Sequence, residues 1–273
     1  AGEFTVSGAV KGTYSTMGSD SASAGSGQGK GLGLTNEFTL GAAGELDNGW
    51  AWTYAQDIDN ATVQDDAKLT MATDYGTVGL FISEGSLSQK YKFDNSAYGI
   101  GSDTGYGGST TTGSTMQYGT NLSSYNNVQY HLPSGILPQG GTFKIGYSPQ
   151  AKVNANASGN AQGTDGSHGD KALETAVSFA PTDALYVGLS YFKETGQVKA
   201  AGGQDQESGS IVGNFTQGPL GLGVGLTKVA VSNATARSSE HAEQFHNIAL
   251  SLGYAVNDNL SVSVGTQDTK YDR

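Results

Sequence analysis

Cysteine is absent from this sequence of 273 residues, and proline (5 residues) and basic residues (14 Lys and Arg) are scarce. Without cysteine the chain can form no disulfide, no thiolate nucleophile and no cysteine-ligated metal site. The basic residues are outnumbered by 25 Asp and Glu, which gives a formal net charge of −11. This balance argues against a nucleic-acid-binding protein, because no basic stripe is available to replace the counterions of phosphates. We expect cations to be attracted instead.

Long apolar runs are also missing. No segment approaches the roughly 18 consecutive apolar residues of a transmembrane helix, so a helical membrane protein is excluded. Glycine is frequent (42 residues) but lacks the triplet period of collagen, and 36% hydrophobic residues are too many for a disordered chain of this charge. The sequence begins directly on a strand-like pattern at Phe4, as we expect of a processed N-terminus. We therefore expect a folded protein.

Apolar side chains recur with a period of two along the whole chain, whereas the helical i, i+3, i+4 pattern never persists. The clearest segment is residues 220–226 (LGLGVGL), in which the large side chains form one face and the glycines form the other. A helix is nearly impossible there because glycine interrupts every second position. The pattern predicts an all-β chain with 13 strands, at residues 4–14, 32–40, 50–54, 69–71, 78–82, 128–132, 143–147, 173–179, 185–191, 209–215, 220–226, 248–254 and 260–264.

Short and long connections between these segments alternate in strict order. Alternate connections of an antiparallel up-and-down sheet emerge at the same end, so one end has tight turns and the other has long loops. A soluble sandwich with Greek-key crossovers would not sort its loops in this way. The alternative is a secreted Gly/Ser-rich β protein in which the alternation is accidental. The short connections are residues 44–49, 74–76, 133–141, 181–184, 217–219 and 256–259, and the long ones are residues 16–31, 59–66, 83–123, 149–170, 196–206 and 232–243.

The two faces of the predicted strands indicate which solvent surrounds the sheet. One parity carries aliphatic and aromatic residues, and 13 such faces turned inward would need a core far larger than side chains can fill. An inverted barrel resolves this, because its apolar face meets lipid and its polar face meets a water-filled lumen. Aromatic residues lie next to both the short and the long connections, as two girdles at lipid headgroups require. The charged residues that this model turns inward are Lys11, Glu37, Asp57, Lys68, Lys144 and Glu174.

The sequence resembles the Gram-negative general porins, and most closely their alphaproteobacterial, Rhodobacter-type branch. The resemblance covers the whole chain as a pattern: an N-terminal strand at residues 3–8 (EFTVSG), alternating hairpins and a very long third long loop at residues 83–123. It implies an outer-membrane, 16-stranded, antiparallel transmembrane β-barrel that forms a homotrimer, whose third loop folds into the lumen.

Two features depart from that family pattern. Only 13 strands can be counted in residues 1–273, so we expect a single barrel domain that lacks its last C-terminal strands. The cluster of arginines that the family places opposite its constriction loop is also absent, because the only arginines are Arg237 and Arg273.

Residues 83–123 are expected to form the constriction. Four aromatic residues lie between positions 91 and 106, and exposed rings in a surface loop would have nothing to pack against. Folding against the inner wall supplies a surface for them; an exposed receptor loop is the alternative. If the loop folds inward, its carboxylates face lysines of the wall and create a transverse field. The residues predicted at this constriction are Glu84, Asp94, Asp103, Lys11, Lys68 and Lys144.

Four acidic residues lie on the two arms of one short hairpin: Asp57, Asp59, Asp65 and Asp66. Their oxygens could converge on a hard cation such as Ca²⁺, either structural or bridging to lipopolysaccharide. The spacing matches no ligand loop of known geometry, so a solvated acidic hairpin is the alternative. The sequence predicts no other cofactor.

The function predicted from these features is passive diffusion of small hydrophilic solutes and ions through a water-filled pore, with weak cation selectivity from the acidic loops. Lipid and lipopolysaccharide of the outer membrane are the expected surroundings. One alternative is a surface adhesin or receptor whose barrel is plugged. Another is a barrel hydrolase that uses His131, but no serine motif flanks this residue and we expect no enzyme.

Overall fold

The computed structural model describes residues 2–17, 29–59, 66–95, 121–149, 171–195, 204–230, 244–258 and 260–272, and within residues 9–37 it describes the backbone alone. Each of the 13 predicted segments forms a strand, so the all-β prediction is confirmed. A 3₁₀ turn, η2 (Leu122–Ser124), is the helical element among the described residues. The strands are β1 (Glu3–Met17), β2 (Gly29–Glu45), β3 (Ala51–Asp59), β4 (Ala67–Thr73), β5 (Gly76–Ile82), β6 (Asn127–His131), β7 (Thr142–Ser148), β8 (Lys171–Thr182), β9 (Leu185–Thr195), β10 (Gln206–Gln217), β11 (Leu220–Ala230), β12 (Gln244–Asn257) and β13 (Leu260–Asp272).

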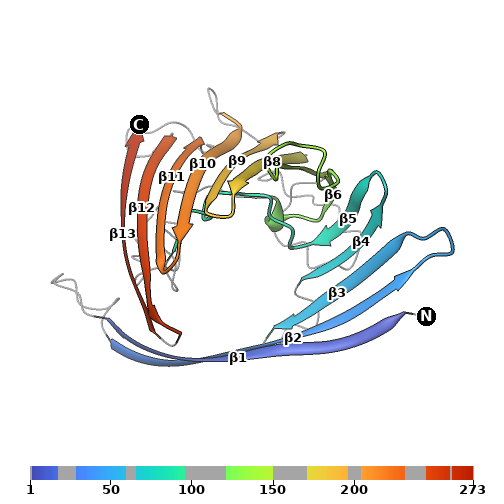
Figure 1. Cartoon of the computed structure of the whole chain (residues 1–273), viewed down its shortest axis with the longest axis horizontal. Helices are drawn as coiled ribbons and strands as arrows, with labels where there is room; N and C mark the ends of the chain where they lie inside the picture. Colours follow the sequence, from blue (N-terminus) through green and yellow to red (C-terminus); the bar gives the residue numbers. More distant parts are fainter. Residues whose placement is uncertain are drawn as a thin grey trace.

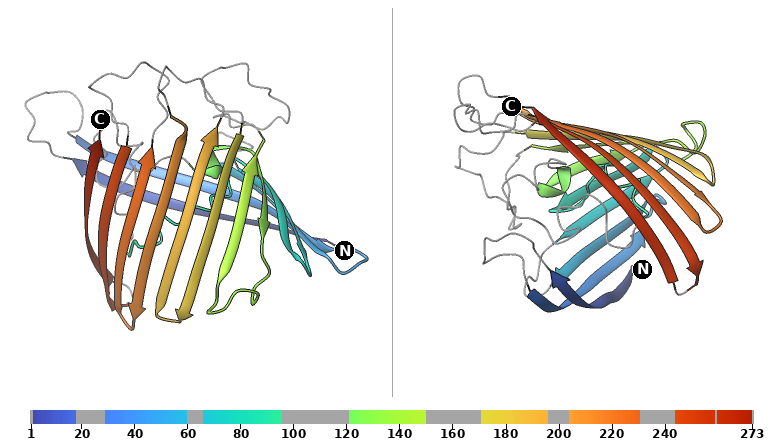
Figure 2. Two further views of the ribbon diagram at one scale, coloured as in Figure 1. Left: turned by 90° about the horizontal axis from the view of Figure 1, so that it is seen from above. Right: turned by 90° about the vertical axis from the view of Figure 1, so that its left-hand side faces the viewer.

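Every strand pairs antiparallel with its neighbours in the chain, and the order in the single sheet is β1 to β13 without a crossover. The turns that join β8 to β9, β10 to β11 and β12 to β13 lie together at one end of the sheet (Figure 2, left). Glycine supplies a positive φ in four of the short connections, at Gly49 (φ 83°), Gly76 (φ 128°), Gly135 (φ 84°) with Gly140 (φ 63°), and Gly218 (φ 57°). The up-and-down topology is therefore as predicted.

The sheet curves strongly, so that β4 to β13 surround a concave face and β1 to β3 continue below it (Figure 1). In the described part of the chain β1 pairs with β2 alone and β13 with β12 alone, so these two strands are the edges of the sheet. The sheet curves as the wall of a barrel does. Because β1 and β13 do not pair with each other, the barrel is not closed in the described part of the chain.

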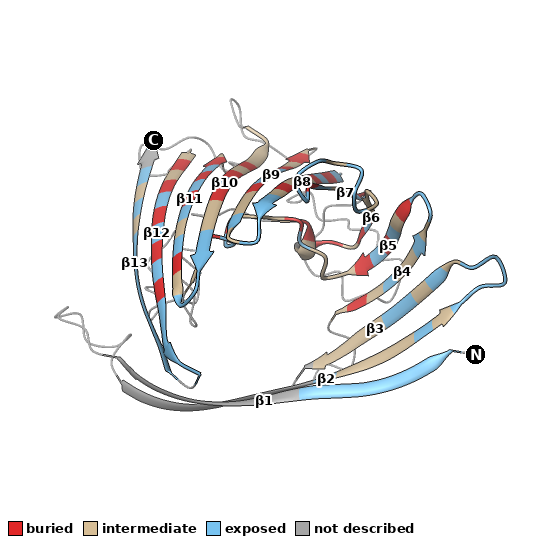
Figure 3. Ribbon diagram, viewed as in Figure 1, coloured by how far each residue is buried: buried red, intermediate tan, exposed pale blue. Residues whose placement is uncertain are grey.

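Burial alternates along β8 to β12 with a period of two (Figure 3). The large aliphatic residues of β11, Leu222, Val224 and Leu226, are exposed on the outer face. Polar residues of the same region, such as Asn247 and Ser251, are buried on the opposite face. This is the reverse of a soluble sheet, and it is the arrangement of a wall with lipid outside and water inside. Among the described residues there is no helix that is both long and apolar enough to cross a membrane.

Candidate functional site

The chain leaves β5 and crosses the concave face of the sheet as residues 83–95, which reach β12 (Figure 1). Backbone N–H groups of this arm donate to side chains of three different strands. Leu87 donates to Glu174 Oε2 on β8 at 3.1 Å, Gln89 to Ser190 Oγ on β9 at 2.9 Å, and Asn95 to Ser251 Oγ on β12 at 2.8 Å. The first arm of the long loop is thus fixed to the inner wall along its length.

Glycines of β11 leave part of the inner face of this strand without side chains, and the end of the arm lies directly against it. A Cβ at Gly225 would lie 2.5 Å from the ring of Phe93, and one at Gly221 would lie 2.6 Å from Oδ1 of Asn95. Real Cβ atoms essentially never come within 3.0 Å of a heavy atom outside their own residue and its chain neighbours, so the arm occupies space that any larger residue would fill. Phe93 is completely buried there and packs against Val212 and Ala249. The expectation that loop aromatics pack on the wall holds for this ring.

Glu174 holds both arms of the loop at once. Its Oε2 accepts the N–H of Leu87 from the outgoing arm and, at 2.9 Å, the N–H of Leu122 from the returning arm. This carboxylate is 1% exposed, and the charge of Lys90, which is also buried, acts on it. Asn127 makes a second connection, because its Nδ2 donates to the carbonyl oxygens of Glu84 and Leu122. The base of the loop is therefore closed by side chains of the wall.

The returning arm packs through Tyr125, whose hydroxyl donates to Glu194 Oε2 on β9 at 2.8 Å. The ring of Tyr125 is stacked on Phe192 with 6.3 Å between the centroids. Glu194 is 2% exposed, so this second carboxylate is also covered by the loop. The two arms therefore share β8 and β9 as their support.

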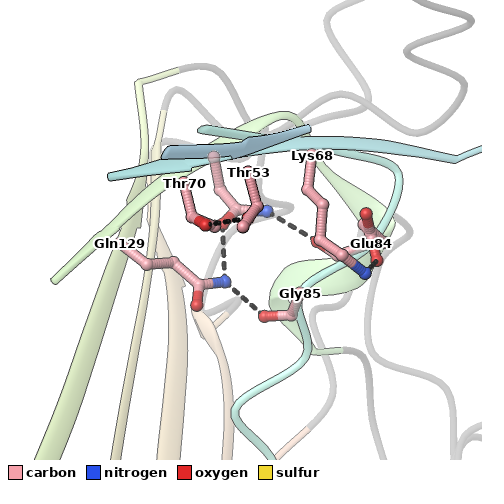
Figure 4. Close-up of polar contacts among 7 residues, drawn as sticks. Thr53, Lys68, Thr70, Glu84, Gly85 and Gln129 are labelled. Carbon is pink, nitrogen blue, oxygen red and sulfur yellow. Dashed lines mark hydrogen bonds and ion pairs between the residues drawn. The ribbon is translucent and has the colours of Figure 1, made fainter. Parts of the chain in front are cut away.

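Two of the predicted constriction residues meet in an ion pair. Lys68 Nζ on β4 lies 3.2 Å from Glu84 Oε2, with 40% and 19% of the two side chains exposed (Figure 4). In the same view Thr53 and Thr70 share a hydrogen bond across β3 and β4, and Gln129 donates to the carbonyl of Gly85. An ion pair this open to water contributes little to stability, so its main effect is on the local field.

The other predicted constriction residues are distributed around the sheet. Lys144 is paired across the strands with His131, and Asp94 lies beside Ser251 of β12, where the two side-chain oxygens are 3.4 Å apart. Lys11 is opposite Thr35 in the backbone pairing of β1 with β2. Asp103 lies outside the described residues. The structure thus brings Lys68 and Glu84 together, whereas Lys144 lies on β7 and Asp94 lies in the loop arm against β12.

The acidic hairpin is described in part. The N–H of Asp57 donates to the carbonyl of Asp66 at 2.8 Å, which joins the two arms, and Asp59 ends β3 opposite Glu37. Asp65 lies outside the described residues. Within the described ranges no group of three or more acidic or histidine side chains is arranged to hold a metal. The Ca²⁺ site stays a prediction.

Reasoning from the sequence did not identify the residues that hold the loop. The period of two places Glu174 on the inner face, but nothing in the sequence shows which loop groups it meets. For Glu194 and Lys90, nothing in the sequence except their charge indicated a role in holding the loop. The alternating glycines of residues 220–226 were a usable signal, because a strand face without side chains leaves room for another segment of chain.

A family model described as Gram-negative porin matches residues 1–273. The chain belongs to the Gram-negative porin family. The fold of this porin is similar to that of an anion-selective porin from Comamonas acidovorans (TM-score 0.69, 15% identity, 99% of this chain and 80% of that chain) and of Salmonella typhi OmpF in a complex with daunomycin (TM-score 0.59, 15% identity, 99% and 79%). No curated protein sequence matches it.

Membership of this family makes the protein an outer-membrane channel for passive diffusion and not an enzyme. His131, the candidate residue of the hydrolase alternative, lies with its Nε2 2.8 Å from Gln129 Oε1 and its ring stacked on Phe81. The predictions of a Gram-negative porin, of an antiparallel sheet that matches porin β-barrels and of a location in the outer membrane are therefore confirmed.

Proposed function

We propose that this porin passes small hydrophilic solutes and ions, that residues 83–123 form its constriction, and that it weakly prefers cations. The proposal rests on the path that residues 83–95 take through the structure. This arm lies across the concave face from β5 to β12 and is hydrogen-bonded to β8, β9 and β12 (Figure 1). A segment fixed there narrows the space that the wall surrounds.

The expected cation preference comes from charge. The chain carries a formal charge of −11, and the long connections that the sequence predicts at the mouth are rich in Asp and Glu. Lys68 forms an ion pair with Glu84, so the positive charge of this lysine is offset by the carboxylate. The mouth therefore attracts cations within a Debye length of about 8 to 10 Å. The Comamonas protein is an anion-selective porin, but at 15% identity it shares the fold and not the charges.

Three further properties belong to the same proposal. The N-terminal strand and the long third loop support a place in the Rhodobacter-type branch, and the resemblance supports a homotrimer. The exposed aliphatic face supports contact with outer-membrane lipid, including lipopolysaccharide. Glu84, Asp94, Asp103, Lys11, Lys68 and Lys144 are proposed to set the field across the constriction.

Reconstitution in a planar bilayer tests this function. Large, stable conductance steps with a reversal potential of cation sign in a KCl gradient are expected. Replacing Asp94 and Asp103 together with Asn should reduce the cation preference. A folded protein that gives no steps would favour the plugged adhesin or receptor, and a reversal potential of anion sign would show that the lysines of the wall outweigh the loops.

A further inference from the structure

The outer face of the sheet carries a row of polar side chains near the ends of the strands that lead to the long loops. The cross-strand pairing places Tyr191, Gly209, Lys228, His246 and Lys270 side by side on β9 to β13. Lys228 has the same parity as Leu222, Val224 and Leu226, so it shares their outward face. The predicted strand ended at Leu226, and this outward lysine was missed for that reason.

On β9 to β12 the next row toward the middle of the wall is apolar, and on β13 it continues as Asp268. It contains Leu189, Ile211, Leu226 and Ile248, with 38%, 53%, 45% and 51% of these residues exposed. Tyr191 stands in the same row as Lys228, and aromatic rings of porin walls lie at the level of the lipid headgroups. Lys228 is therefore placed at the boundary between headgroups and acyl chains.

A hollow of about 580 Å³ lies on this part of the outer face. Tyr191, Lys228 and His246 line it on the side of the long loops, and Leu189, Leu226 and Ile248 line it toward the middle of the wall. The hollow thus has a basic end at headgroup level and an apolar end at acyl-chain level. Such a surface matches a lipid that carries negative charge at its head.

The acidic residues nearby face other cations. Glu207 lies 2.5 Å from Lys193 Nζ and accepts the hydroxyl of Tyr191 at 3.0 Å, while Asp272 lies 3.4 Å from His246. Asp268 and Asp272 flank Lys270 on β13. Among the described residues Lys228 has no ion pair. The salt bridges of the described residues do not include Lys270 either, but Lys270 does not line the hollow, so Lys228 is the lysine that a ligand in the hollow would meet.

We propose that Lys228 binds the phosphate of a phosphorylated outer-membrane lipid whose acyl chain lies in the hollow. A phosphate is favoured because it offers several strong acceptor oxygens to a lysine ammonium. A lipid is favoured over a protein partner because this face is the membrane-facing side of the wall. The inference rests on the contact with outer-membrane lipid proposed above; the site is separate from the channel, so it does not depend on the proposed selectivity.

Native mass spectrometry of the detergent-solubilised protein tests the site, with diphosphoryl lipid A and its dephosphorylated form as the probes. We expect the wild type to retain the phosphorylated form preferentially, and Lys228→Gln to weaken that retention about fivefold, as the loss of one lysine at a membrane surface does. Lys171→Gln is the matched control, because Lys171 is exposed at the corresponding end of β8 and does not line the hollow.

Two results would overturn the proposal: equal retention by Lys228→Gln and the wild type, or equal retention of the two lipids by the wild type, which would assign the hollow to acyl chains alone. Displacement of the lipid by inorganic phosphate with no dependence on acyl chains would assign the site to a free anion and would also overturn it. Single-channel conductance should be the same in both variants, so failure of this site is distinguishable from failure of the channel.

Discussion

The backbone carbonyl of Phe93 lies directly over Gly223, closer to the position of a Cβ at that glycine than the 3.0 Å that real Cβ atoms keep. Residue 223 is on the inner face of β11, and Phe93 belongs to the arm that crosses the lumen side of the wall. Glycine at this position therefore sets how close the loop comes to the wall. In the proposed constriction, the width of the pore would depend on this glycine.

Replacing Gly223 with Ala should push the arm away from the wall and toward the pore axis. The overpacking costs on the order of 1–3 kcal/mol, which the exposed side of the arm can relieve by moving. We expect lower single-channel conductance and a noisier open state in a planar bilayer. Gly213→Ala is the control, because a Cβ there meets only ordinary contacts, the nearest at 3.6 Å. Identical single-channel current traces for Gly223→Ala and Gly213→Ala would show that the close contact at Gly223 does not position the loop.

Replacing Glu174 with Ala should loosen both arms of the loop. The N–H groups of Leu87 and Leu122 would lose their shared acceptor, at about 1–3 kcal/mol for each group that stays buried. Limited proteolysis of the folded protein should then cut within residues 83–123 faster, and the conductance should fluctuate. Glu174→Gln keeps an oxygen that can accept both bonds, so it should behave close to the wild type. An equal effect of the two substitutions would assign the role to charge and not to the shared acceptor.

The sequence predicted the wall better than the loop. The period of two and the alternating connections are local signals, and they located all 13 strands and the outward face of residues such as Val224. The contacts of Glu174 with Leu122 and Leu87 and of Gly223 with Phe93 join residues 52, 87 and 130 positions apart, and no local pattern encodes such pairs. Phe81 shows the same limit: it lies under the loop on the inner face, although aromatic residues were expected at the girdles.

The pair of Lys68 and Glu84 should tune selectivity in opposite directions. Replacing Glu84 with Gln leaves the lysine uncompensated and should move the reversal potential in a KCl gradient toward anion preference. Replacing Lys68 with Gln should move it toward cation preference by a comparable amount, because each change alters the local charge by one. Both shifts should shrink at high salt. Shifts of the same sign would show that the pair does not face the permeating ions.

The orientation of the wall can be tested on two adjacent residues of β13. Val264 faces outward in the row of Leu252, and Ser263 faces inward opposite Gly253; both are exposed. Val264→Lys should lower the free energy of unfolding in lipid vesicles by about 2–4 kcal/mol if it lies near the midplane, whereas Ser263→Lys should change it little. The reverse order in a denaturant titration would mean that the faces are assigned wrongly.

The most direct test of the constriction is the single-channel conductance of a variant that lacks residues 99–113, measured in planar bilayers beside the wild type. Residues 83–95 and 121–126, which carry the contacts to Glu174, Asn127 and Glu194, are kept in this variant. We predict a folded protein with a clearly larger conductance, because chain is removed from the lumen while the anchors stay. An unchanged conductance in a folded variant would place these residues outside the pore and contradict the account.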